Sequence, residues 1–193
     1  MPPMRFFSIL LPLLFAAILA APAVSSAQTA TGQAAKPQAK PAAVGKDPVL
    51  LGQYGDWCAY SAAPDGKKIC FALAQPASSK TNPPNRPRDP IYFFISTRPA
   101  ENVKEEVSVA VGYPLKPDSE AKAEIDSAAF AMYTQDDGAW VKSADDEAKL
   151  IDAMRKGADL TIKGTSSRGT QTTDTYSLKG VSQALERVEK ECN

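Results

Sequence analysis

Two short apolar runs around a tight-turn signal constrain the fold of this chain more than any other feature. Residues 55–75 read GDWCAYSAAPDGKKICFALAQ, in which Asp65-Gly66 is a dipeptide typical of β-hairpin turns. With these two residues at the centre of the turn, the register pairs Cys70 with Ser61 and Cys58 with Leu73. Side chains alternate along a strand, so the two cysteines lie out of register and on opposite faces.

Short apolar runs separated by turn signals continue to the end of the chain. A polar, proline-rich loop is expected at 79–90. Strands are expected at residues 50–62, 69–75, 91–97, 103–113, 123–134, 139–142, 158–163 and 173–178. The pattern predicts a mainly β fold, an antiparallel β-sandwich or barrel-like sheet, with two short α-helices at about 143–156 and 180–192.

Both helices have recognisable ends or faces. Ser143 is a suitable N-cap, acidic residues follow it in the first turn, and Gly157 can close the helix. The apolar residues of the second helix recur at helical spacing, so that one face packs on the sheet; they are Val181, Ala184, Leu185, Val188 and Cys192.

The first 47 residues read as export and spacer sequence. Residues 1–27 have a basic start, an apolar stretch and small residues before a cleavage site after Ala27, as in a signal peptide. Residues 28–47 are rich in alanine, proline, lysine and glutamine and are predicted to be a disordered spacer. Residues 48–193 then form a single domain, located in the periplasm or secreted, with no integral membrane segment in the mature chain.

Composition excludes several classes of function. The chain has no histidine, which removes the usual general base near neutral pH and the commonest metal ligand. No catalytic site, metal site or cofactor is therefore predicted. The chain has 22 basic and 22 acidic residues without a basic face, so no nucleic-acid partner is expected.

Three cysteines in an exported chain favour one disulfide and one remaining thiol. The hairpin register argues against Cys58–Cys70, and the apolar face of the second helix brings Cys192 down to the sheet. Cys70–Cys192 is the favoured pair and Cys58–Cys192 competes with it. Cys58 is then a free thiol, either buried in the core and inert beside its apolar neighbours or exposed and able to link a dimer.

Several short motifs resemble one known family. Gly55-Asp56-Trp57 at a strand start, Gly66-Lys67-Lys68-Ile69-Cys70 after the turn, and Leu178-Lys179-Gly180-Val181-Ser182-Gln183-Ala184-Leu185 with the later Cys192 are similar to invasion-associated locus B (IalB) proteins. The resemblance implies an exported protein of an alphaproteobacterium. The founding members of this family are associated with host-cell invasion, and no catalytic residues can be carried over.

Two functional hypotheses follow. The first is a non-enzymatic periplasmic or envelope protein that contacts an unknown protein or other envelope or host component through two polar loops. Their candidate contact residues are Lys80, Arg86, Arg88, Ser166, Ser167 and Arg168. The alternative is a small histidine-independent hydrolase using carboxylates, with Asp136 and Asp137 beside Glu124 or Asp126.

Overall fold

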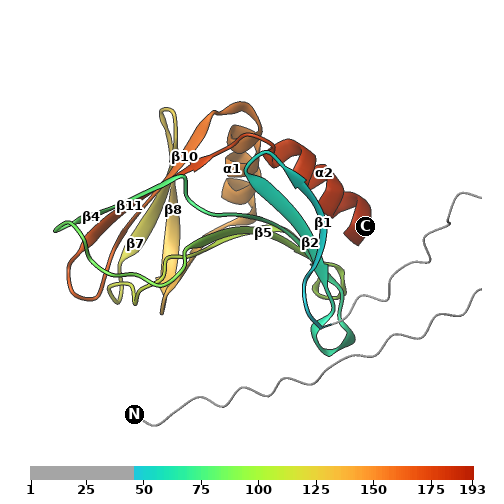
Figure 1. Ribbon diagram of the computed structural model, residues 1–193, viewed down its shortest axis with the longest axis horizontal. Helices are drawn as coiled ribbons and strands as arrows, with labels where there is room; N and C mark the ends of the chain where they lie inside the picture. The colour runs from blue at the N-terminus through green and yellow to red at the C-terminus, as the bar shows by residue number, and fades with distance from the viewer. Residues whose placement is uncertain (1–45) are drawn as a thin grey trace, which may run out of the picture. The chain divides into compact units, whose positions relative to one another are not determined.

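The computed structural model describes residues 46–193, which form one antiparallel sheet and two helices (Figure 1). The predicted signal peptide and most of the predicted spacer lie outside the described residues. The eleven strands are ordered β1-β2-β3-β5-β6-β9-β8-β7-β10-β11-β4, and the sheet is not closed into a barrel. The predicted mainly β class is confirmed, as a single open, bent sheet.

The first half of the described chain contains β1 (Val49–Tyr54), β2 (Trp57–Ala62), β3 (Ile69–Ala74), β4 (Ser78–Asn82), β5 (Tyr92–Arg98) and β6 (Val103–Ala110). The second half contains β7 (Glu120–Ile125), β8 (Ala128–Gln135), β9 (Gly138–Val141), β10 (Asp159–Thr165) and β11 (Gln171–Ser177). Helix α1 (Ala144–Lys156) separates β9 from β10, and α2 (Val181–Cys192) follows β11.

The β2–β3 hairpin has the predicted register. Cys70 pairs with Ser61 and Cys58 pairs with Leu73 across the two strands. Asp65 and Gly66 both have left-handed backbone angles, with φ of 54° and 77°. Aspartate and glycine tolerate this conformation better than most residues, which is why the dipeptide is a reliable hairpin signal.

Three predicted elements differ from the structure. The strand expected at 50–62 is divided into β1 and β2 by a turn at Gly55, whose φ is 57° and where a Cβ atom would lie 2.4 Å from the carbonyl oxygen of Lys179. The run 123–134 is likewise divided by a turn at Asp126, with φ of 52°. Part of the expected loop 79–90 is strand β4, because an exposed edge strand pairs through its backbone and needs no apolar alternation.

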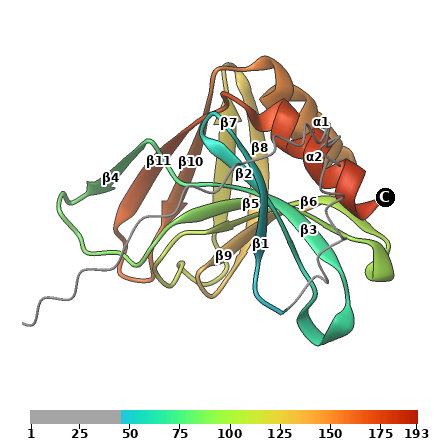
Figure 2. The ribbon, with the colours of Figure 1, turned by 45° about the vertical axis from the view of Figure 1, so that its right-hand side comes forward.

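Both helices pack on one face of the sheet and close the core. Helix α2 contacts β1, β2, β3 and β5, whereas α1 contacts β6, β8 and β9 (Figure 2). Three large aromatic side chains at the centre of this core touch edge to face: Trp57, Phe93 and Tyr176. The rest of the core is built mostly of aliphatic side chains and alanine, and Tyr54, Tyr113 and Phe130 pack against it partly buried.

The predicted helix boundaries and first cap are confirmed. The side chain of Ser143 accepts a hydrogen bond from the backbone N–H of Asp146 at 3.2 Å. Glu147, one position further along α1, accepts the N–H of Val107 on β6 at 2.9 Å. Burial raises the pKa of the Glu147 carboxyl. These contacts fix the start of α1 against the sheet.

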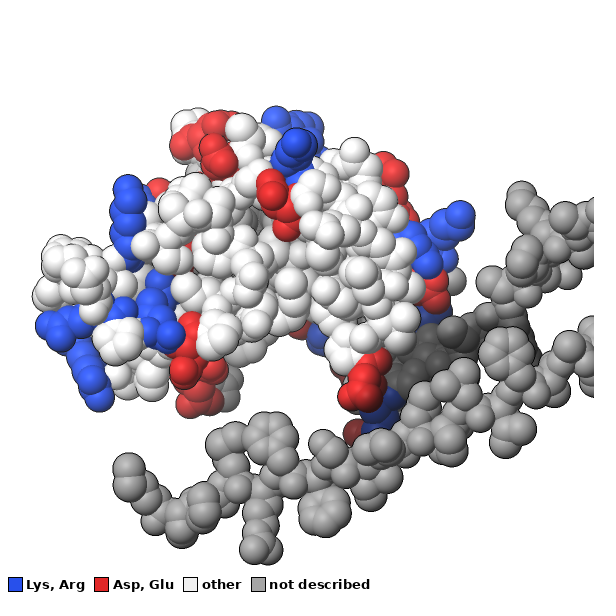
Figure 3. All heavy atoms as spheres, viewed as in Figure 1, with Lys and Arg blue, Asp and Glu red and all other residues white. Residues whose placement is uncertain are grey.

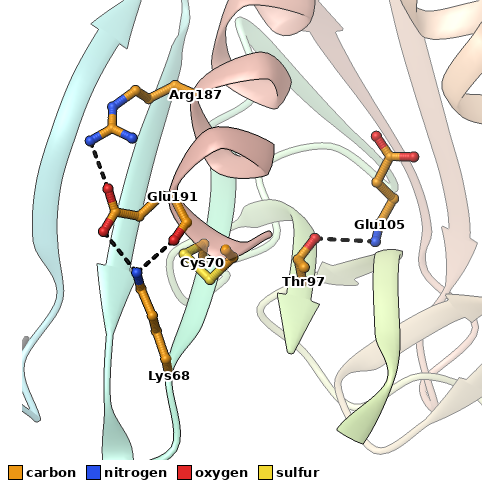
Figure 4. The surroundings of a disulfide bond; sticks show 7 residues. Lys68, Cys70, Thr97, Glu105, Arg187 and Glu191 are labelled. Atoms are coloured by element: carbon orange, nitrogen blue, oxygen red, sulfur yellow. Dashed lines mark hydrogen bonds and ion pairs between the residues drawn. A yellow bond between two sulfur atoms is a disulfide. The ribbon is translucent and has the colours of Figure 1, made fainter. Parts of the chain in front are cut away.

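The Cys70–Cys192 disulfide joins β3 to the end of α2, with the two Cα atoms 5.9 Å apart. Figure 4 shows that a cluster of ions surrounds it: Glu191 pairs with Lys68 and with Arg187, each at 2.9 Å. The favoured pairing is therefore the one present. Cys58 is unpaired and half-buried on the opposite face of the hairpin.

Candidate binding cleft

The two polar loops with candidate contact residues meet at one end of the sheet. The loop between β4 and β5 and the β10–β11 hairpin line a shared cleft of about 690 Å³. They meet because β4 pairs with β11, so that Asn82, where the loop begins, faces Gln171, where the hairpin ends. The cleft is thus a consequence of the position of β4 at the sheet edge.

A third segment, residues 112–114, also lines the cleft and forms backbone hydrogen bonds with both loops. The N–H of Asp89 donates to the carbonyl oxygen of Gly112 at 3.0 Å. On the other side, the N–H of Ser167 donates to the carbonyl oxygen of Pro114 at 2.9 Å. Gly112 has φ of 72°, and a Cβ atom there would lie 2.2 Å from the Asp89 carbonyl oxygen, so this approach requires glycine.

Arg88, which lines the cleft, belongs to a buried ion pair with Asp174. The Arg88 guanidinium donates to both carboxylate oxygens of Asp174 at 2.7 Å, and also to the carbonyl oxygen of Val111. The two side chains are 7% and 0% exposed. Arg88 also lies over the ring of Tyr113, 4.9 Å from its centroid. A bidentate, desolvated pair of this kind fixes the loop firmly, since either charge alone would be costly to bury.

Two tyrosines flank this ion pair. The Tyr113 hydroxyl shares a hydrogen bond of 2.6 Å with the hydroxyl of Thr172, and burial raises the pKa of Tyr113. The Tyr176 hydroxyl is buried without a hydrogen-bond partner among the described residues, and burial raises its pKa further. Both phenols are therefore neutral at physiological pH; Tyr113 lines the cleft, whereas Tyr176 is fully buried in the core.

The rim of the cleft carries exposed, basic side chains. Arg86 and Arg168 lie on opposite loops, are exposed, and form no ion pair with any residue in 46–193. Lys80, on β4, lines an adjoining hollow of about 930 Å³ together with Arg86. Figure 3 shows Lys and Arg side chains gathered at this end of the domain, where β4 and β11 lie. Asp89 is the only acidic residue lining either space in the described part of the chain.

The six predicted contact residues thus fall into two groups, one exposed and one largely buried. Lys80, Arg86, Ser167 and Arg168 are exposed and available to a ligand. Ser166 is 8% exposed and its hydroxyl accepts the N–H of Thr170, which shapes the hairpin turn. Arg88 is largely buried, and its guanidinium is occupied by the ion pair with Asp174.

This arrangement suits an anionic group. Two exposed arginines without acidic partners in residues 46–193, in a cleft also lined by Ser and Thr hydroxyls, can donate several hydrogen bonds to a carboxylate or phosphate. No three His, Cys, Asp or Glu side chains within residues 46–193 lie close enough together to hold a metal ion.

Comparison of the sequence with models of known protein families identifies the family of this chain. The model of the Invasion associated locus B (IalB) protein family matches residues 57–189, well over half of the chain. The chain belongs to this family. The matched part of this IalB domain runs from the start of β2 into α2 and includes the cleft and its ion pair. Comparisons with curated proteins and with solved structures give no match.

The carboxylates of the alternative hypothesis do not cluster in this IalB domain. Asp136 and Asp137 are exposed in the β8–β9 turn, whereas Asp126 is exposed at the other end of β8. Eight strand residues separate the two turns, about 26 Å at ~3.3 Å per residue. Glu124 is paired with Lys163 at 2.6 Å. The structure therefore gives these residues no shared site.

Sequence reasoning missed three residues that build the cleft of the IalB domain: Tyr113, Thr172 and Asp174. One signal for Asp174 was present. It occupies an alternate position between Thr172 and Tyr176, on the inward face of a strand, where a charge needs a partner. No local pattern pointed to Arg88 as that partner.

Proposed function

We propose that this IalB-family protein is an exported, non-enzymatic protein of the periplasm or outside the cell that binds an envelope or host partner through its cleft. The observation that carries the proposal is the convergence of two loops, about 80 residues apart in sequence, on one cleft with two arginines that have no acidic partner in residues 46–193. The partner presents a carboxylate or phosphate between Arg86 and Arg168.

Export is supported by two independent features. Residues 1–27 have the sequence pattern of a cleavable signal peptide. The Cys70–Cys192 disulfide belongs to the kind of bond that persists in oxidising compartments and is rare in the cytosol. No helix within residues 46–193 is long and apolar enough to cross a bilayer.

A rigid base and a basic rim suit reversible binding of a partner better than catalysis. The ion pair of Arg88 with Asp174 holds the loop in place, so the exposed side chains lose less conformational freedom when a partner binds. The rim charges would attract an anionic partner over about a Debye length of ~8 Å at physiological salt. Binding should therefore weaken as salt concentration rises.

The test is recovery of partners from envelope extracts by the mature protein and by an Arg86→Ser/Arg168→Ser variant. A matched control replaces two exposed basic residues far from the cleft, Lys67→Ser/Lys156→Ser. We expect partner recovery to be lost in the cleft variant, retained in the control, and reduced by high salt. Equal recovery by all three proteins would refute the assignment of the cleft.

A further inference from the structure

Strands β1 and β4 are the two edges of the sheet, and they differ in how well a further strand can pair with them (Figure 1). Strand β1 carries the exposed apolar side chains of Val49 and Leu50, but a bulge between Leu50 and Gly52 interrupts its register. Bulges on edge strands twist the backbone and discourage pairing with another chain. The more apolar edge is therefore the protected one.

Strand β4 is a regular edge. It pairs with β11 over five successive residues, from Ser78 opposite Thr175 to Asn82 opposite Gln171, without a register shift. On its other side it pairs with no strand within residues 46–193, and four of its five residues are exposed. The N–H and C=O groups of that side form a straight edge about 17 Å long at ~3.4 Å per residue, to which another strand can hydrogen-bond.

The hollow of about 930 Å³ lies along this free edge. It is lined by Ser79, Lys80 and Thr81 of β4 and by the following loop, but by no residue of β11. Successive side chains of a strand point to opposite faces, so a space that touches three successive residues lies beside the edge rather than over one face. The free edge of β4 therefore has open space next to it.

The loop that encloses this hollow is held in place. The backbone N–H of Arg86 donates to the hydroxyl oxygen of Thr81 at 3.2 Å, which keeps the loop beside the strand. Four of the eight residues 83–90 are proline, and proline fixes the backbone angle φ. The space beside β4 is thus largely preformed, and an added strand does not have to order the loop first.

The charge at this edge is basic and unpaired. Lys80, at the centre of β4, and Arg86 are exposed and form no ion pair with any residue in 46–193. Across the ladder, Lys80 faces the uncharged Thr173. Lysine on an edge strand discourages pairing with apolar or basic strands. An acidic residue directly opposite is favoured, because facing side chains lie within about 5.5 Å of each other.

A strand edge also distinguishes between kinds of anionic partner. It presents backbone donors and acceptors in alternation, and an extended polypeptide complements both in register. A phosphate group or a sugar carboxylate can pair with Lys80 and Arg86 but cannot continue this ladder. Arg86 lines both the hollow and the cleft, so a polypeptide paired with β4 brings its acidic side chains to the rim of the cleft.

We propose that the partner of this domain is a protein, an acidic extended segment of which adds to the free edge of β4 as a further strand. One acidic side chain faces Lys80, and another reaches Arg86 where the hollow meets the cleft. Main-chain hydrogen bonds supply affinity, and the two basic side chains supply selectivity. This inference rests on the proposed function, because it names the class of partner that binds at the cleft.

The test is an NMR titration of the chain that begins at Gln28 with a blocked peptide of alternating threonine and glutamate, long enough to cover β4. The proposal invokes only backbone pairing and charge, so the probe needs no sequence from the natural partner. We expect the amide signals of Ser78–Asn82 to shift and their exchange with solvent to slow. The same peptide, N-methylated at two successive central residues, loses donors on both of its edges and should bind more than about tenfold more weakly.

A charge exchange at the centre of β4 tests selectivity. Lys80→Glu replaces an exposed side chain, and unchanged amide shifts in the rest of the domain would verify that it remains folded. The variant should bind the glutamate peptide about tenfold more weakly and should gain binding of the corresponding threonine–lysine peptide. Lys67→Glu, at an exposed lysine of the β2–β3 turn, is the matched control and should leave both affinities unchanged.

Three results would overturn the proposal. Equal affinity of the N-methylated peptide would show attraction by charge without strand addition. An unchanged peptide preference in Lys80→Glu would remove β4 from the contact. Displacement of the glutamate peptide by oligogalacturonate, or by vesicles containing anionic phospholipid, with the same shifts at β4 would assign the edge to a glycan or a membrane instead.

Failure of this inference and failure of the proposed function give different results. If the glutamate peptide binds β4 but recovery of envelope partners does not depend on Arg86 and Arg168, the assignment of the cleft is refuted and the strand-addition site remains. If recovery depends on these arginines but the glutamate peptide does not bind, the cleft remains and addition to β4 is refuted.

Discussion

The two ends of the sheet hold distant parts of the chain together in different ways. At the end near α2, Cys70 and Cys192 are joined covalently, and the ion cluster around them is partly exposed. At the cleft, Arg88 and Asp174 are joined only by electrostatics and hydrogen bonds, but they are almost fully buried. The first attachment depends on oxidation and the second on exclusion of water, so each can be perturbed without touching the other.

Removing the disulfide should have the largest effect. The bond closes a separation of 122 residues, for which the chain-entropy model gives about 5 kcal/mol of stabilisation. A Cys70→Ser/Cys192→Ser variant should lose a free energy of unfolding of this order in denaturant titrations. Cys58→Ser, at the unpaired and half-buried thiol, serves as the control and should change little. If the cleft residues also lose their native amide shifts while the variant is still folded, the two ends are not independent.

Breaking the buried ion pair should come next. Asp174→Asn leaves the Arg88 guanidinium buried and without its counter-charge, which should cost about 4 kcal/mol in the free energy of unfolding. An Arg88→Met/Asp174→Leu double variant should be less destabilised than the single variant, because no unpaired charge remains. Thr173→Ser, on the outward side of the same strand, controls for disturbance of β11. A double variant as unstable as the single one would mean that packing, not charge, dominates.

The ion cluster beside the disulfide should contribute least, with a definite pH dependence. Hydrogen bonds from Lys68 and Arg187 lower the pKa of the Glu191 carboxyl below its ordinary value. Its contribution to stability is therefore present above the unfolded pKa of about 4.3 and is lost as pH falls through the lower folded value. The side chains are partly exposed, so the contribution should be under about 1 kcal/mol.

The measurement is the free energy of unfolding of Glu191→Gln against pH. The unsubstituted protein should lose more stability than the variant on acidification below about pH 5, and the two should converge at the lowest pH. Glu186→Gln, an exposed residue of the same helix with no ion pair in the described residues, is the control. Parallel curves for the protein and Glu191→Gln would contradict the assigned role.

The same contrast explains how much the sequence could predict. The hairpin register and the apolar face of α2 follow from local rules, namely turn chemistry and helical spacing, and together they led to Cys70–Cys192. The cleft does not follow from local rules. Arg88 and Asp174 are 86 residues apart and meet only because β4 pairs with β11 at the sheet edge.

Strand β4 itself is the reason that this contact was missed. Its residues, Ser78–Asn82, are polar and mostly exposed, so they show no apolar alternation and read as a loop. The predicted loops were therefore correctly recognised as polar surface, but their meeting required the strand order. The separation of Arg88, which supports the loop, from the exposed Arg86 and Arg168 likewise required side-chain burial.

The Cys70–Cys192 bond also constrains the order of events as this domain folds, because it can form only after the last helix is present. Cys192 follows every strand of the sheet, so a chain exported amino-terminus first, as we propose for this protein, would present Cys70 to the oxidising compartment long before its partner. During that interval Cys58 is the only other thiol in the chain. The hairpin register holds these two cysteines on opposite faces, so early formation of the β2–β3 hairpin protects Cys70 from pairing with the wrong neighbour.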